Sequence, residues 1–120
     1  FKLDSATDEG RRRLNDTHID SERVLESLVT CASLVPTWIQ TMALDFEGPT
    51  LAGAEEQAYI ELLRTAIQRG AQLRGVLLYG LARPSHQPEA PLLRALPAGE
   101  LEALGQRIAR ATGLAVQVTP

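Results

Sequence analysis

The sequence predicts an α/β protein made of repeated strand–helix units around a parallel sheet. Short runs that are apolar on both faces alternate along the chain with longer segments of helical periodicity. Within these runs Trp38, Val76 and Leu114 are equally spaced. A regular strand–helix–strand series needs right-handed crossovers, and consecutive strands therefore run parallel.

Length and composition indicate one ordinary globular unit. The chain has 120 residues, of which 44% are hydrophobic and 22% are charged, and its net charge is -3. Acidic and basic residues are interspersed, so nucleic acid is not an implied partner; Arg11, Arg12 and Arg13 are expected on a solvated helix face. No apolar run approaches the ~18 residues of a membrane span. A cytoplasmic location is expected, since the single cysteine suits a reducing compartment.

The first half of the chain reads as strand, helix, helix, strand. Residues 1–5 resemble the end of a strand, and residues 7–14 form a short helical turn. A full helix then begins at Asp20 or Ser21, either of which can cap it, and ends before Pro36. Cys31 is expected on its buried face. Residues 38–44 are the next strand, with Trp38 and Met42 expected in the core.

The second half repeats the pattern. A helix is predicted over residues 55–69, with Gly70 at its end, and residues 75–81 are the clearest strand. Residues 83–96 contain several prolines and no periodic face, which predicts a long loop. A helix over residues 98–112, ended by Gly113, leads to a last strand at 114–118.

Such a series fits either a small doubly wound domain or half of an eight-strand barrel. A free-standing sheet usually protects its edge strands with charge or proline, and only Lys2 and Pro120 offer this here. We therefore favour half of a partial TIM-type barrel, with residues 1–120 as the C-terminal portion of a longer domain. Unprotected edges also predict that the isolated chain self-associates. A stand-alone α/β interaction module remains the alternative from another functional class.

Ligand sites in parallel α/β folds lie beyond the carboxyl ends of the strands. This rule selects Asp4 and Ser5 after the first strand, although both could simply cap the following turn. Gln40 and Thr41 lie on the second strand and alternate between its faces, so at most one of them faces a barrel interior. The third strand offers Tyr79 and the rim residue Arg83, which suits an anionic group. The fourth offers Gln117 and Thr119.

Other chemistry is less well supported by the sequence. Lys2 shares a face with Asp4 and could be the Schiff-base lysine of a barrel aldolase. His18 and His86 lie in polar surroundings with no companion at metal-ligand spacing. The sequence contains no glycine-rich phosphate loop, nucleophile elbow or zinc-spaced Cys/His set. A complete catalytic constellation is therefore not present in these residues.

Several stretches resemble the second half of radical S-adenosylmethionine (radical SAM) proteins. Residues 2–5, followed by Asp8-Glu9-Gly10 and Arg13-Leu14-Asn15, resemble the fourth strand and the turn after it. The fifth strand is resembled by residues 39–42 and the helix after it by residues 59–63. The sixth strand and the segment that leaves it are resembled by residues 76–84. The Tyr-Gly-Leu-Ala-Arg-Pro stretch at 79–84 is the most specific part; residues 100–104 and 113–116 resemble the closing helix and strand.

The resemblance implies a partial barrel of about six strands, half of which is supplied elsewhere. The family's Cys-x3-Cys-x2-Cys loop, which binds a 4Fe-4S cluster, and its Gly-Gly-Glu motif belong to the missing N-terminal half. This half would contribute S-adenosylmethionine contacts and the mouth of the substrate site. By position, the cofactor contacts are Asp4, Ser5, Gln40, Thr41, Tyr79, Leu81 and Arg83. The fifth-strand glycine-rich pattern of some members is not matched, and no substrate is indicated. The parent protein is expected to be an enzyme of oxidoreductase type and this chain alone to be inactive.

Overall fold

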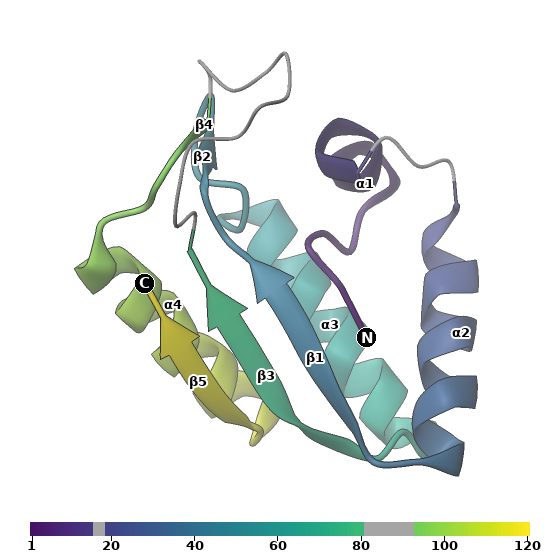
Figure 1. The fold of residues 1–120 in the computed structure, drawn as a ribbon. Coiled ribbons are helices and arrows are strands. Elements are labelled where there is room, and N and C mark those ends of the chain that lie inside the picture. Colours follow the sequence, from purple (N-terminus) through teal and green to yellow (C-terminus); the bar gives the residue numbers. More distant parts are fainter. Residues whose placement is uncertain (16–18, 81–92) are drawn as a thin grey trace.

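A parallel β-sheet forms the centre of the molecule (Figure 1). The computed structural model describes residues 1–15, 19–80 and 93–120. The strands β1 (Thr37–Met42), β3 (Leu73–Tyr79) and β5 (Ala115–Thr119) pair in the order β1–β3–β5, and both pairings are parallel. The expected α/β class with a parallel sheet is confirmed.

The N-terminal residues add a fourth parallel segment beside β1. Lys2 forms a parallel bridge with Gln40, the Leu3 amide donates to the Gln40 carbonyl, and the Gln40 amide donates to the Phe1 carbonyl, both at 2.8 Å. The pairing ends at Asp4, because the Met42 amide donates to the Asp4 carboxylate instead of to a backbone carbonyl. The four segments therefore lie side by side in the same order in which they occur along the chain.

Three helices cover one face of this sheet. They are α2 (Ser21–Leu34), α3 (Ala54–Gln68) and α4 (Ala98–Thr112), and Figure 1 shows α3 and α4 behind the strands, with α2 beside them. The Asp20 carboxylate accepts the Arg23 amide and starts α2, as its position predicts. Gly113 ends α4 in the left-handed conformation, at a φ of 76°. The short helix α1 (Asp8–Asn15) lies at the carboxyl end of the strands.

The hydrophobic core lies between the sheet and these helices. Strand side chains alternate between faces, so Ile39 and Thr41 of β1 and Val76 and Leu78 of β3 are buried beneath the helices. Trp38, Gln40 and Met42 point to the opposite face, where no helix of the described residues lies. The helices contribute apolar stripes to the core: Leu25, Leu28 and Ala32; Tyr59, Ile60, Leu62, Leu63 and Ala66; Leu101, Leu104 and Ile108.

Some local expectations are wrong. A two-residue antiparallel pair, β2 (Asp45–Phe46) with β4 (Leu93–Arg94), extends above the sheet where only loops were predicted. Cys31 is exposed, because the buried stripe of α2 runs through Leu28 and Ala32 and leaves Cys31 on the flank of the helix. Of the three clustered arginines, only Arg12 and Arg13 are solvated.

Arg11 is instead buried and joins α1 to the start of α2. Its guanidinium donates to the Asp8 carboxylate at 2.6 Å, to the Ser21 hydroxyl at 2.9 Å and to the Ile19 carbonyl. The Ser21 hydroxyl and amide also donate to Asp8, at 2.9 Å each, and these bonds, with the Arg11 charge, lower the pKa of the Asp8 carboxyl. A buried guanidinium needs such partners, which the three-residue spacing of Asp8 and Arg11 supplies.

Thr41 links three elements through its hydroxyl, which bonds the Leu3 carbonyl at 2.7 Å and the Tyr59 hydroxyl at 2.8 Å. We predict that Thr41→Val destabilises the fold by about 1–3 kcal/mol, because two buried polar groups lose their partner while volume is preserved. Urea unfolding measures this. Thr30→Val on the exposed face of α2 is the control and should stay within about 0.5 kcal/mol of wild type. Equal effects of the two substitutions would contradict the assigned role of Thr41.

Candidate functional site

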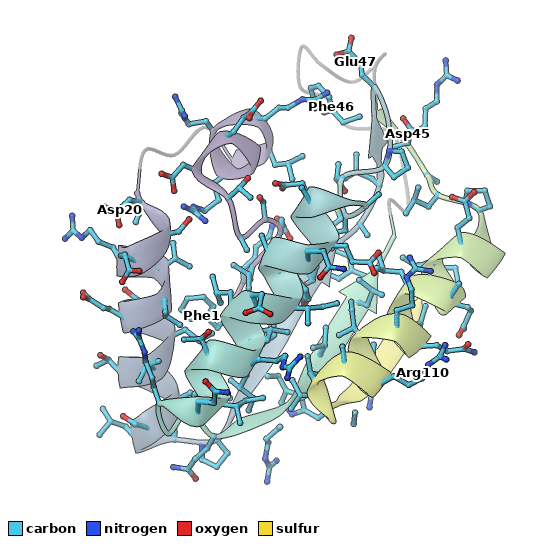
Figure 2. All side chains as sticks on the ribbon, turned by 180° about the vertical axis from the view of Figure 1, so that it is seen from behind. Phe1, Asp20, Asp45, Phe46, Glu47 and Arg110 are labelled. Atoms are coloured by element: carbon cyan, nitrogen blue, oxygen red, sulfur yellow. The ribbon has the colours of Figure 1, made fainter. Side chains whose placement is uncertain are left out.

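The sheet face without helices is the candidate site, and we call it the open face. The strand register places its side chains in three rows, which follow from the pairings Trp38–Gly75–Ala115, Gln40–Leu77–Gln117 and Met42–Tyr79–Thr119. Lys2 extends the second row through its bridge with Gln40. Figure 2, seen from behind, shows the other side of the sheet covered by α2, α3 and α4.

The first row is a floor made by one large side chain over two small ones. A Cβ atom added at Gly75 would lie 2.6 Å from Trp38 Cζ3 and 2.6 Å from the Ala115 carbonyl oxygen. The Trp38 indole therefore lies across Gly75, and only glycine leaves it room. This row sits at the amino ends of the strands and closes the lower end of the open face.

The second row carries the polar groups. Gln40 and Gln117 are exposed and flank the half-buried Leu77. Their side-chain carboxamides make no hydrogen bond with the described residues. A carboxamide offers both donors and an acceptor. Two of them, on β1 and β5 with β3 between them, can bind a polar ligand such as a nucleoside at several points.

The third row lies at the carboxyl ends of the strands. Tyr79 is half-buried between Met42 and Thr119, and its backbone is fixed because the Ala43 amide donates to the Tyr79 carbonyl at 3.0 Å. The next residue, Gly80, donates its amide to the Thr119 carbonyl at 2.9 Å. An aromatic ring held in this way can stack on a planar ligand group. Leu81 and Arg83, expected to continue this contact surface, lie outside the described residues, as do His18 and His86.

Asp4 lies at the border of the open face. Its side chain is only 2% exposed, and one carboxylate oxygen accepts the Met42 amide at 2.9 Å. Lys2 Nζ lies 3.8 Å from the other oxygen and remains 56% exposed. The buried charge is thereby compensated by a backbone donor and a cation. The pair leaves the Lys2 ammonium at the surface of the open face, within reach of an anionic group.

Ser5 and Thr41 point into the protein. Ser5 Oγ donates to Glu55 Oε1 at 2.6 Å, and Thr7 Oγ1 donates to Glu55 Oε2 at 2.5 Å, so one carboxylate of α3 fixes the turn after Asp4. Gly10 of α1 packs directly on this cluster, because a Cβ there would overlap Ser5 Oγ. Both Ser5 and Thr41 are fully buried beneath the open face.

Tyr59 is the buried partner of Thr41 and lies on α3. Burial is the main reason that the pKa of the Tyr59 phenol is raised above its ordinary range; the hydrogen bond with Thr41 acts in the opposite direction, and the Asp4 charge adds to the rise. The hydroxyl is thus a neutral hydrogen-bonding group of the core. It supports the strand that carries Gln40 and is not a group for acid–base chemistry.

The structure therefore divides the sequence-selected residues into two sets. Gln40 and Tyr79 lie on the open face with Asp4 at its border, whereas Ser5 and Thr41 hold the scaffold behind it. Sequence reasoning placed Trp38 and Met42 in the core, but both are half-buried on the open face. Strand alternation from Gln40 would have found them, since residues two apart share a face.

A cavity of about 350 Å³ lies beside the open face, between the outer edge of residues 1–5 and the side of α2. Phe1, Ile19 and Val24 give it an apolar wall. A second cavity, of about 280 Å³, lies between α1 and the start of α3 and is lined by Glu9, Arg13 and Glu55 among others. The first of them separates the sheet edge from the adjacent flank of α2.

Comparisons of the chain with protein-family models, curated proteins and solved structures give no match. Within the described part of the chain, no three His, Cys, Asp or Glu residues are grouped so as to hold a metal ion. No helix in that part is long and apolar enough to cross a membrane. The open face is therefore the feature of the molecule from which a function can be inferred.

We predict that Gly75→Ala destabilises the fold by about 1–3 kcal/mol, because the new methyl group overlaps Trp38 and the Ala115 backbone. The only tryptophan should report the displacement as a change in its fluorescence emission. Gly99→Ala, in the first turn of α4, is the matched control: a Cβ there meets nothing within 4 Å. It should leave the emission unchanged and stability equal or higher. An unperturbed Gly75→Ala variant would show that Trp38 does not form the floor.

Proposed function

We propose that the chain is the C-terminal half of a radical SAM barrel and that its open face binds S-adenosylmethionine. The observation that carries the proposal is the sheet order: residues 1–3, β1, β3 and β5 are parallel and adjacent in chain order, with α2, α3 and α4 on one face. Singly wound strands with helices on one side are the arrangement of (β/α) barrels. A doubly wound domain would carry helices on both faces.

The side chains of the open face support this reading. Inward-facing side chains of such barrels stack in layers, and the rows based on Trp38, Gln40 and Met42 give three such layers. Above the Trp38 floor, the second row carries the exposed Gln40 and Gln117, and the third row carries the exposed Thr119. Ligands bind at the carboxyl ends of barrel strands, which is where Tyr79 and Thr119 lie.

The cofactor would be held mainly by Gln40 and Tyr79. The Gln40 side-chain carboxamide, which has no partner among the described residues, would bond the ribose hydroxyls or the adenine edge. The Tyr79 ring, in the next row of the open face, offers a stacking surface. Leu81 and Arg83 would extend the contact along the exit of the strand. Asp4 acts at the border by fixing the Met42 backbone, and Ser5 and Thr41 act through the scaffold.

The described residues do not fit the 4Fe-4S cluster. Such a cluster needs several cysteine thiolates, whereas Cys31 is single, lies on the outside of α2 and does not face the open face. The cluster ligands in this proposal come from the other half of the barrel. With a reduced cluster held by that other half, bound S-adenosylmethionine would supply one-electron hydrogen-abstraction chemistry. This half binds and orients the cofactor and is inactive alone, in keeping with the reducing cytoplasm that such a cluster favours.

The exposed Lys2 keeps one alternative open, a barrel aldolase in which Lys2 forms a Schiff base with a carbonyl substrate. Borohydride reduction in the presence of small aldehydes and ketones distinguishes the two. A covalent adduct on Lys2, absent from a Lys2→Arg variant, would favour the aldolase. Without an adduct, the cofactor-binding proposal stands against this rival.

We predict that S-adenosylmethionine binds the chain and that Gln40→Ala weakens this binding by about three- to ten-fold. This corresponds to the loss of one hydrogen bond, which contributes about 0.5–1.5 kcal/mol to the binding free energy. Isothermal titration calorimetry measures the affinity. Gln72→Ala is a control of the same residue type, since Gln72 is exposed at the opposite end of the sheet. Its affinity should equal that of wild type. Absence of heat at millimolar cofactor, or equal losses in both variants, would overturn the proposed site.

A further inference from the structure

The charges of the chain are interspersed along the sequence but separate in the fold. Each of α2, α3 and α4 leads through a short turn into a parallel strand, so the second halves of these helices lie at the amino ends of the strands (Figure 1). We call this end of the molecule, made of residues 28–39, 62–76 and 105–117, the basic end. It contains no acidic residue, although the chain has a net charge of -3, and it carries five arginines: Arg64, Arg69, Arg74, Arg107 and Arg110.

Most of these arginines have no carboxylate to neutralise them. Within the part of the chain that the structure describes, only Arg107 of the five forms an ion pair, with Glu56 of α3 at 2.9 Å. The other four are exposed. The helix dipole favours cations at helix C-termini, which accounts for Arg69 and Arg110 but not for Arg74, a residue of β3. The basic end therefore presents a positive field to the solvent.

Exposed apolar side chains gather at the same end. Leu34, Val35 and Ile67 are three of the four large apolar residues exposed among the described residues. Leu34 is 78% exposed and Val35 54%, and together they form a tip where α2 ends. The tip is an apolar surface that a binding partner could cover.

The turn between α3 and β3 brings two of the arginines to this tip. The Gln72 amide donates to the Ala32 carbonyl at 2.8 Å, and the Gln72 carboxamide donates to the Ser33 carbonyl at 3.1 Å. Arg69 and Arg74 lie three residues before and two residues after Gln72. The basic end thus combines free guanidinium groups and exposed apolar side chains in one surface.

Such a combination suits the surface of an anionic lipid bilayer. A bilayer accepts apolar side chains at the boundary of its acyl chains and surrounds them with anionic headgroups. The unpaired arginines come from α3 and the turn after it, from β3 and from α4, so they match a broad array of anionic groups better than one bound anion. A nucleic acid would supply phosphates but would leave Leu34 and Val35 without apolar cover.

We propose that the basic end is a peripheral binding surface for anionic membranes. Leu34 and Val35 enter the headgroup region, and the arginines around them bind the anionic headgroups. In this orientation the carboxyl ends of the strands point away from the bilayer. The open face and both sheet edges stay available to the cofactor and to the other half of the barrel, and the proposal depends on neither of them.

Co-sedimentation with lipid vesicles tests the charge component. The chain should bind vesicles that contain phosphatidylserine, and added salt should weaken this binding. Combining Arg69→Gln with Arg74→Gln should weaken it by about thirty-fold, because each arginine near an anionic surface contributes about five-fold. The matched control combines Arg12→Gln with Arg23→Gln, which removes the same charge from exposed residues at the opposite end, and should change binding by less than about three-fold. Equal losses in the two double variants, or no binding of the wild-type chain, would overturn the proposal.

A second set of variants tests the apolar component. Combining Leu34→Ser with Val35→Ser should weaken vesicle binding by about ten-fold or more. Ile19→Ser is the control, since Ile19 is 51% exposed at the opposite end of α2, and it should bind like the wild-type chain. Binding to duplex DNA as tight as to vesicles, with the Leu34 and Val35 substitutions affecting neither, would show a nucleic-acid surface and overturn the proposal. The calorimetric test of cofactor binding is independent of all these results.

Discussion

The hydrogen bonds at the point where the N-terminal segment leaves β1 determine how the other strands and the helices are arranged. The Met42 amide donates to the Asp4 carboxylate and the Thr41 hydroxyl bonds the Leu3 carbonyl, so the ladder ends at these residues and the chain turns toward α1. The same Thr41 hydroxyl bonds Tyr59 of α3. One group of side chains therefore fixes the register of the first two segments and the side of the sheet on which the helices lie.

The consequence is a sheet with two unlike faces. Beneath the helices, Ile39, Val76 and Leu78 are fully buried, and apolar burial there supplies most of the driving force for folding. On the other face Trp38, Gln40 and Tyr79 are only partly covered or exposed. The buried side holds the strands rigid, so that the open face presents fixed side chains to whatever binds it, a ligand or a second half-barrel.

The sequence predicts the elements well because their signals are local. The apolar runs, Asp20 as a cap and Gly113 as a terminator lie close to the observed boundaries. The faces are harder to predict, since a strand that is apolar on both sides does not show which side receives the helices. Trp38 and Met42 were misplaced for that reason. Arg11 was misplaced because two of its partners, the Ile19 carbonyl and the Ser21 hydroxyl, lie at and just before the start of α2, and only Asp8 leaves a local pattern.

Nuclear magnetic resonance of β1 tests most directly whether a polar ligand uses only the open face. Along this strand, neighbouring side chains belong to opposite faces. On titration with S-adenosylmethionine, we expect shifts of the Trp38 indole, the Gln40 side-chain carboxamide and the Met42 methyl signals. The Ile39 and Thr41 methyl signals should stay in place. Shifts of equal size on both sets of residues, or shifts confined to Ile39 and Thr41, would contradict this.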